Sequence, residues 1–126
     1  MEDGSALTRR GLGDAAEEAC VEFLEARGYR ILARNFLCRY GELDIVAEKD
    51  AVVCFVEVRM RTLGIWGDPA STVGRAKQRR VVKAALHYLN AARKPVRMVR
   101  FDVMSVVGRG TDARVEHLPD AFDAGM

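Results

Sequence analysis

Two stretches decide the fold of this chain: Gly41-Glu42-Leu43-Asp44-Ile45-Val46 and, further along, Val53-Cys54-Phe55-Val56-Glu57-Val58-Arg59. Both are rich in β-branched and aromatic residues, which predicts two neighbouring strands. Each also carries acidic residues among the apolar ones. Such groups are costly in a sheet unless something binds them, so the hairpin is expected to hold a functional site.

The polar pair Lys49-Asp50 separates the two strands and predicts a tight two-residue turn. That turn would place Glu42 opposite Glu57, with Asp44 one diagonal step away. The acidic groups would then share one face of the sheet, where like charges destabilise the pairing unless a cation lies between them. A bulge would change this geometry.

Other elements follow from periodicity and from Gly and Pro positions. A helix is expected from about Leu12 to Arg27, ended by Gly28. A second helix, capped by Ser71 or Thr72, runs to about Ala92 and is ended by Pro95. The expected strands are Tyr29–Leu37, Tyr40–Glu48, Ala51–Met60, Val96–Val107 and a short one near Arg114–Leu118. The fold class is therefore α/β, a mixed sheet flanked by helices in the order α-β-β-β-α-β.

Composition fits one domain, because 126 residues with 49% hydrophobic and 30% charged residues can form a compact core. We expect a flexible N-terminus over residues 1–10, a single domain over 11–118 and a C-terminal tail over 119–126. The three cysteines lack metal-ligand spacing and are expected to be reduced and buried. No apolar run approaches the roughly 20 residues needed to span a bilayer, which predicts a cytoplasmic protein without membrane contact.

Charge is unevenly distributed along the chain. The segment from Pro69 to Phe101 contains nine Lys or Arg residues and no Asp or Glu, although the net charge of the whole chain is only +2. A polyanionic partner would explain this segment, and so would a solvated basic helix face.

Helical phase selects two further site candidates. Glu17 falls inside the apolar arc of the first helix, where a carboxylate needs a partner. Lys77 lies on the apolar stripe of the second helix, one turn before Val81. It could reach the acidic site or a phosphate held there, or it could extend past the helix end into solvent.

Two or three carboxylates with oxygen-rich surroundings suit Mg²⁺ or Mn²⁺. Such an ion can polarise a phosphate and activate water for hydrolysis. The alternative is a salt-bridged cluster in which Arg59 and Arg61 neutralise Glu57 and Glu42.

A wider pattern resembles a known family. Asp44 followed by Glu57-Val58-Arg59 is similar to the Asp…Glu-x-Lys signature of the PD-(D/E)XK nuclease superfamily. The chain resembles the YraN-like family of bacterial endonuclease-fold proteins, itself similar to archaeal Holliday junction resolvases, over residues 10 to 107. The matching positions are Leu12-Gly13, Glu17, Phe23-Leu24, Gly28-Tyr29-Arg30-Ile31-Leu32, Asn35, Gly41-Glu42-Leu43-Asp44, Phe55-Val56-Glu57-Val58, Arg61, Gly67, Lys77, Tyr88-Leu89 and Phe101-Asp102-Val103.

This resemblance implies a restriction-endonuclease-like fold with Asp44, Glu57 and the Val58 carbonyl as metal ligands. Glu17 would be the helical carboxylate of the site, and Glu42 belongs to the matched motif. Lys77 matches a position that the family usually fills with lysine.

The sequence departs from the pattern at two positions. Ala16 replaces a usual glycine, which is a mild change, but Arg59 stands where the nuclease signature has lysine. Arginine stays protonated and is bulkier, so it is a poor base although it can stabilise a phosphate.

The expected function is a Mg²⁺- or Mn²⁺-dependent endonuclease acting on DNA, including branched or structured DNA. Its catalytic residues would be Glu17, Asp44, Glu57, Arg59 and Lys77. Resolvase relatives act as dimers, which implies a homodimer. A non-catalytic nucleic-acid-binding protein on the same scaffold is the alternative that Arg59 favours, and a protein-interaction scaffold is a third. Phosphate contacts are expected from Arg61, Arg75, Lys77, Arg79, Arg80 and Lys83.

Overall fold

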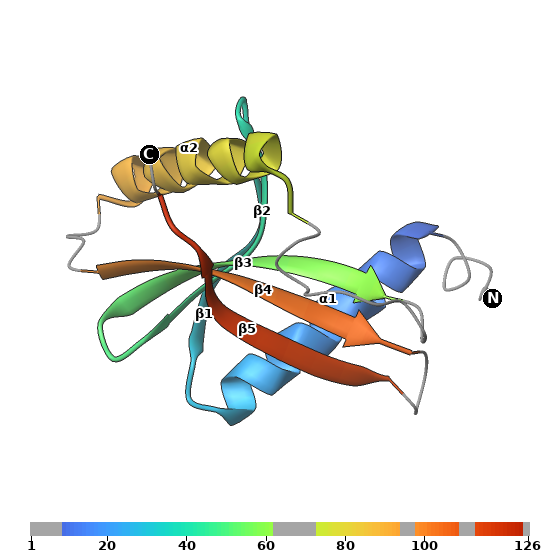
Figure 1. Cartoon of the computed structure of the whole chain (residues 1–126). Helices are drawn as coiled ribbons and strands as arrows, with labels where there is room; N and C mark the ends of the chain where they lie inside the picture. The colour runs from blue at the N-terminus through green and yellow to red at the C-terminus, as the bar shows by residue number, and fades with distance from the viewer. Residues whose placement is uncertain (1–8, 62–72, 94–97, 109–112, 125–126) are drawn as a thin grey trace.

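The two opening stretches form the centre of a five-stranded sheet with one helix on each face (Figure 1). The computed structural model describes residues 9–61, 73–93, 98–108 and 113–124. The strand order is β1-β2-β3-β4-β5, and only β3 and β4 run parallel. This confirms the predicted mixed sheet flanked by helices. The elements are α1 (Arg9–Ala26), β1 (Arg30–Cys38), β2 (Gly41–Lys49), β3 (Val52–Arg61), α2 (Arg75–Ala92), β4 (Met98–Val107) and β5 (Arg114–Phe122).

Helix α1 ends as predicted at Gly28, which has a left-handed φ of 90°. The Gly28 amide donates to the Glu25 carbonyl at 3.1 Å, and the Tyr29 amide donates to the Leu24 carbonyl at 3.0 Å. This pair of bonds is a Schellman cap, which a residue without Cβ forms most easily. The cap directs the chain from α1 into β1.

The β2–β3 turn lies one residue later than predicted. Val46 pairs with Phe55 and Lys49 with Val52, so the two turn residues are Asp50 and Ala51. Both have left-handed φ values, 53° and 66°, as a type I′ turn requires. The predicted register was therefore wrong by two residues, because Ala51 gives no sequence indication of a left-handed conformation. A shift of two residues preserves which face each side chain occupies.

Helix α2 begins after Gly74, which occupies the N-cap position without a side-chain hydrogen bond. The predicted caps, Ser71 and Thr72, lie outside the described residues, as do the loop before them and Pro95. The helix ends at Ala92 as predicted, with Arg93 in the left-handed conformation. The buried residues of α2 are Val81, Val82, Ala84, Ala85 and Leu89.

Strand β5 is longer than predicted. It continues to Phe122, so the expected C-terminal tail from residue 119 begins inside a strand. Its pairing with β4 buries β4 from Phe101 to Val107. The start of β4 before Met98 lies outside the described residues.

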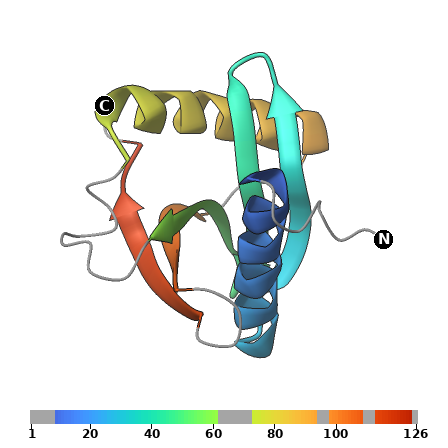
Figure 2. The ribbon, with the colours of Figure 1, turned by 90° about the vertical axis from the view of Figure 1, so that its right-hand side faces the viewer.

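Two apolar cores lie on opposite faces of the sheet. Helix α1 packs on Ile45, Cys54 and Val56, and α2 packs on Val46 and Phe55. Figure 2 shows the two helices separated by the sheet, seen from the end at which β3 terminates. Neither described helix is long and apolar enough to cross a membrane.

The cysteines are free. Cys20 and Cys54 are buried in the core under α1, as predicted, whereas Cys38 is only half-buried, contrary to prediction. Burial raises the pKa of the Cys20 thiol to about 12. Cys20 is therefore a protonated core side chain at neutral pH.

Candidate functional site

The face alternation of β2 is interrupted at Asp44. Leu43 packs on the α2 side of the sheet, whereas Ile45, two residues later, packs on the α1 side. Across from Asp44 in β1, Asn35 has a left-handed φ of 52°. The kink turns both Asp44 and Ile45 toward α1, so a carboxylate enters a face that is otherwise apolar.

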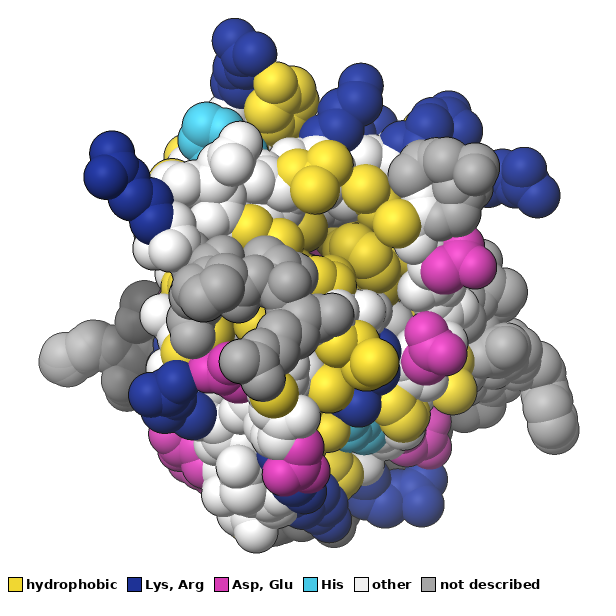
Figure 3. Space-filling model, turned by 90° about the vertical axis from the view of Figure 1, so that its left-hand side faces the viewer, with side chains coloured by type: hydrophobic (Ala, Val, Ile, Leu, Met, Phe, Trp, Pro, Cys, Tyr) yellow, Lys and Arg dark blue, Asp and Glu magenta, His cyan; other side chains and the backbone are white. Residues whose placement is uncertain are grey.

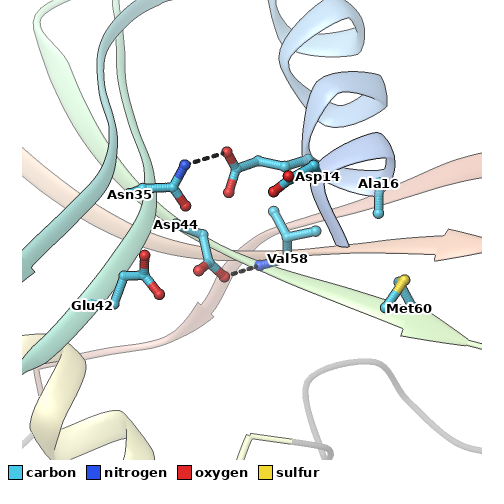
Figure 4. Close-up of a pocket in the computed structure, with 8 residues that line it drawn as sticks. Asp14, Ala16, Asn35, Glu42, Asp44, Val58 and Met60 are labelled. Carbon is cyan, nitrogen blue, oxygen red and sulfur yellow. Dashed lines mark hydrogen bonds between the residues drawn. The ribbon is translucent and has the colours of Figure 1, made fainter. Parts of the chain in front are cut away.

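A pocket of about 460 Å³ lies between the N-terminal half of α1 and strands β1, β2 and β3 (Figure 4). In Figure 4 the carboxylates of Glu42 and Asp44 reach from β2 into this space beside Val58. No Lys or Arg is among the described residues that line it. The pocket is therefore suited to a cation. Its lining residues are Asp14, Ala16, Glu17, Asn35, Glu42, Asp44, Val58 and Met60.

Glu17 brings a buried carboxylate to the pocket from α1, as its helical phase predicted. It is only 7% exposed. Asn35 Nδ2 donates to its Oε1 at 2.9 Å and Arg34 Nε donates to the same oxygen at 3.2 Å. Burial raises the pKa of Glu17, and these two donors oppose the rise. The carboxylate is thus held in a fixed orientation at the wall of the pocket.

Asp44 is the central carboxylate of the site. The Val58 amide donates to its Oδ2 at 2.8 Å and so links β2 to β3. Burial raises the pKa of Asp44 to about 7, and the charge of the neighbouring Glu57 contributes to the rise, against the Val58 bond. Two carboxylates this close to each other bind a shared proton or a cation more favourably than they bind nothing.

The prediction that the acidic groups share one face of the sheet is wrong: Glu42 and Asp44 face the pocket on the α1 side, whereas Glu57 lies on the face that α2 covers. Glu57 is 5% exposed. Lys77, from the first turn of α2, places Nζ 3.2 Å from Glu57 Oε2. Of the two alternatives for Lys77, the structure confirms the one in which it reaches the acidic group. Asp44 thus joins the pocket on the α1 side to an ion pair on the α2 side.

Comparison with known proteins gives the family. The sequence profile described as "Uncharacterised protein family UPF0102" matches residues 16–106. The chain belongs to the UPF0102 family. A UPF0102 protein of Myxococcus xanthus is 61% identical over 126 residues, which is all of both chains. One from Geobacter metallireducens is 44% identical over 117 residues, covering 93% of this chain and 96% of the relative. One from Clostridium perfringens is 38% identical over 115 residues, covering 90% and 94%. These matches confirm the expected membership of the YraN-like family.

In the alternative interpretation, Arg59 and Arg61 of β3 neutralise the acidic cluster of this UPF0102 protein, and the structure describes these two arginines only in part. Arg59 pairs with Ser105 of β4 and, by alternation along β3, shares the α2 face with Glu57. It is partly buried and is not among the described residues that line the pocket. The side chain of Arg61 lies outside the described part of the structure. The ion pair that Glu57 forms with Lys77 links β3 to α2.

The predicted phosphate-binding residues of α2 divide into two groups. Lys77 turns inward to Glu57, while the remainder are exposed. Figure 3 shows Lys and Arg side chains projecting along the edge of the molecule where α2 lies. The exposed members are Arg75, Arg79, Arg80 and Lys83.

A second buried charge, Asp102 of β4, was not expected to take part in any site, and the pocket does not include it. It is 0% exposed and accepts from Arg100, from the amide of Asp120 and, at 2.8 Å, from His117 Nε2. Burial alone would raise the pKa of Asp102, but these donors lower it to about 2. The alternation Phe101-Asp102-Val103 could have identified it as a carboxylate on an apolar face. Its contacts join β4 to β5.

Asn35, Arg34 and Asp14 are the polar residues of the pocket and its wall that were not selected from the sequence as site candidates. Asn35 stands in the matched family pattern, but nothing in the strand periodicity indicates its left-handed φ. Within the described part of the chain, no group of three or more His, Cys, Asp or Glu residues is arranged to hold a metal ion. Asp44 and Glu57 are a pair of hard oxygen donors, which fits Mg²⁺ because that ion keeps several water ligands.

Proposed function

We propose that this UPF0102 protein is a divalent-metal-dependent nuclease that hydrolyses DNA phosphodiesters, including those of branched or structured DNA. The observation that carries the proposal is the adjacency of Asp44 and Glu57, two carboxylates on neighbouring strands, of which Asp44 lines an acidic pocket. The pair has no evident role in packing, because burial and the charge of Glu57 both oppose the ionisation of Asp44. A cation relieves both costs.

Asp44 and Glu57 would hold Mg²⁺ or Mn²⁺, with the Val58 carbonyl as the third ligand that the family resemblance implies. Bound there, the ion supplies positive charge to a phosphate and lowers the pKa of a bound water. Glu17, fixed by Asn35 and Arg34, faces the same pocket and can accept a proton or a hydrogen bond from that water. Glu42 adds negative charge at the pocket wall.

The basic residues would act on the substrate rather than on the ion. Lys77 lies close enough to Glu57 to contact a phosphate bound at the pair. The exposed face of α2 would hold the flanking backbone of the DNA through non-specific phosphate contacts. Arg59 stays charged and can stabilise a developing negative charge, but it does not accept a proton.

Cleavage assays test the proposal. The purified protein is incubated with four-way junction, flap and linear duplex DNA in Mg²⁺, Mn²⁺ or EDTA. We expect cleavage only with metal, with a loss of at least about 100-fold in the Asp44→Ala and Glu57→Ala proteins and normal cleavage by Glu25→Ala, which changes an exposed carboxylate on α1. Cleavage that persists undiminished without Asp44 would reject the assignment.

Arg59 favours a second candidate, a nucleic-acid-binding protein that uses the nuclease scaffold without catalysis. Lysine at this position can activate water, and arginine cannot. This candidate predicts equal DNA affinity in EDTA and Mn²⁺, no cleavage of any substrate, and no effect of Glu57→Gln on DNA affinity. If the protein is a nuclease, Mn²⁺ should change the DNA affinity, cleavage should require the metal, and Glu57→Gln should alter both properties.

A further inference from the structure

Lys77 differs from the other basic residues of α2. It lies in the first turn of the helix and forms an ion pair with Glu57. The Lys77 side chain is 38% exposed, whereas the Glu57 side chain is 6% exposed. The neighbouring Arg75, Arg79 and Arg80 are exposed. One cationic side chain of this face is therefore directed toward the acidic pair.

The ammonium group occupies a particular place in the site. Nζ lies 3.2 Å from Glu57 Oε2, and its charge also acts on Asp44. A divalent ion shared by the two carboxylates would compete with the Lys77 ammonium for the Glu57 carboxylate. Two cations competing for one buried carboxylate repel each other strongly where the local dielectric is low.

The stem of Lys77 allows it to leave. Lysine carries its charge on four flexible methylenes, and this side chain is more than a third exposed, so Nζ can swing toward solvent without unfolding α2. Once displaced, it would lie beside the other basic residues at the start of the helix, where a DNA phosphate is expected.

We propose that Lys77 is the resident counter-ion of the metal-free site, that a divalent ion must displace it from Glu57, and that the displaced ammonium then binds the phosphate of the DNA. The inference rests on the proposed metal-dependent function. Metal binding would then favour DNA binding, because it releases the Lys77 ammonium for a DNA phosphate. DNA binding would favour metal binding in turn, because a phosphate that holds Lys77 leaves Glu57 available to the ion. Metal-free protein would be held in an inactive arrangement by its own lysine.

Calorimetric titration with Mn²⁺, without DNA, tests the displacement. We expect Lys77→Met to bind Mn²⁺ about fivefold more tightly than the unmodified protein, since one competing ion pair is removed. Lys83→Met, which removes the same charge from an exposed position of the same helix, should change the affinity less than about twofold. Lys77→Arg, which keeps the charge, should not bind more tightly than the unmodified protein.

Equal affinities for Lys77→Met and Lys83→Met would overturn the inference while leaving the metal site in place. Absence of Mn²⁺ binding in every protein would overturn the metal site and this inference together. A crystal structure of the unmodified protein with Mn²⁺ decides the matter independently of any variant's stability. The Lys77 Nζ to Glu57 Oε2 distance should exceed about 4 Å when the ion is bound. An ion bound by Asp44 and Glu57 with this ion pair intact would contradict displacement.

Discussion

Asp44 combines three properties that rarely coincide at one strand residue: it is partly buried, it faces a like charge and it accepts a hydrogen bond from the neighbouring strand. Its pKa is raised from 3.8 to about 7, so folding favours its protonated form. The contribution to stability is present at acid pH and is lost as the pH rises through about 7. Without metal, the site therefore opposes folding at neutral and alkaline pH.

The first prediction follows from this loss of stability with rising pH. In EDTA at about pH 8, Asp44→Asn should be more stable than the unmodified protein, by at most about 4 kcal/mol, because one unit of pKa shift corresponds to about 1.4 kcal/mol. Urea unfolding between about pH 4 and pH 8 should show a flatter profile for the variant. Asp14→Asn, at an exposed pocket residue, serves as the control and should retain the original slope. An unchanged slope in Asp44→Asn would show that Asp44 is ionised throughout.

Arg59 gives the second residue-scale prediction. If water activation limits the nuclease, Arg59→Lys should raise the cleavage rate by about tenfold, because a lysine can lose its proton in a partly buried site. The rate is measured in single-turnover assays with saturating Mn²⁺. Arg59→Gln, which provides neither charge nor base, is the matched comparison and should be slower than both. A lysine variant no faster than the arginine protein would assign water activation to other groups.

Sequence reasoning at this scale succeeded where a charge interrupted a regular apolar pattern. Glu17 and Lys77 were selected by helical phase alone, and both are directed inward. It failed where the backbone itself departs from regularity. Asn35 lines the pocket from a left-handed backbone conformation, and Asp14 lines it from the N-terminal half of α1. Hydrophobic periodicity predicts neither of these positions.

Among the elements, the β2–β3 hairpin shows why a site can be predicted from an incorrect register. The true turn at Asp50 and Ala51 moves every pair by two residues, and a shift of two does not by itself change the face that a side chain occupies. The kink at Asn35 and Asp44 then changes which face the acidic residues of β2 share, and only the structure reveals it. The order of the elements along the chain and the mixed sheet flanked by helices followed from the sequence pattern, whereas the directions of individual carboxylates did not.

The kink supports a prediction that separates backbone strain from side-chain bonding. Asn35→Ala loses the hydrogen bond to Glu17 and places a Cβ-bearing residue at a φ of 52°, whereas Asn35→Gly loses only the bond. Both should be destabilised, with the alanine variant less stable than the glycine variant by about 1 kcal/mol. Urea unfolding of the pair measures the difference directly. An alanine variant equal to or more stable than glycine would mean that the strand relaxes its conformation when Asn35 is replaced.

Asp102 of β4 gives a second prediction about how neighbouring strands are held together, here β4 and β5. Asp102→Asn removes the negative charge that Arg100 and His117 share, and it leaves a partly buried guanidinium less compensated. We expect a loss of about 3 kcal/mol in the free energy of unfolding. Asp123→Asn, an exposed change just after β5, should cost less than about 0.5 kcal/mol. Equal stability of the two variants would remove the reason to regard this network as the link between β4 and β5.

The whole molecule brings two opposite charges to one end of the sheet. The acidic pocket opens beside α1, and the basic first turns of α2 begin near the same end of β3 (Figures 1 and 2). Strands β2 and β3 form the partition between them, and Asp44 and Glu57 lie within it. A polyanion can therefore be held by α2 while one phosphate is presented to the pair, and this depends on the layered fold rather than on any single motif.

This arrangement predicts how DNA binding depends on salt. Removing one phosphate-binding side chain should reduce the slope of log affinity against log salt concentration by about 1, so the double variant Arg79→Ala, Arg80→Ala should reduce it by about 2. Binding is measured by fluorescence anisotropy in EDTA, which separates α2 from the metal pair. Arg114→Ala, at an exposed residue of the β5 edge, should leave the slope unchanged. If the β5 change and the α2 changes act equally, the DNA follows the overall charge of the protein, and α2 would not be the surface that positions a phosphate over Asp44 and Glu57.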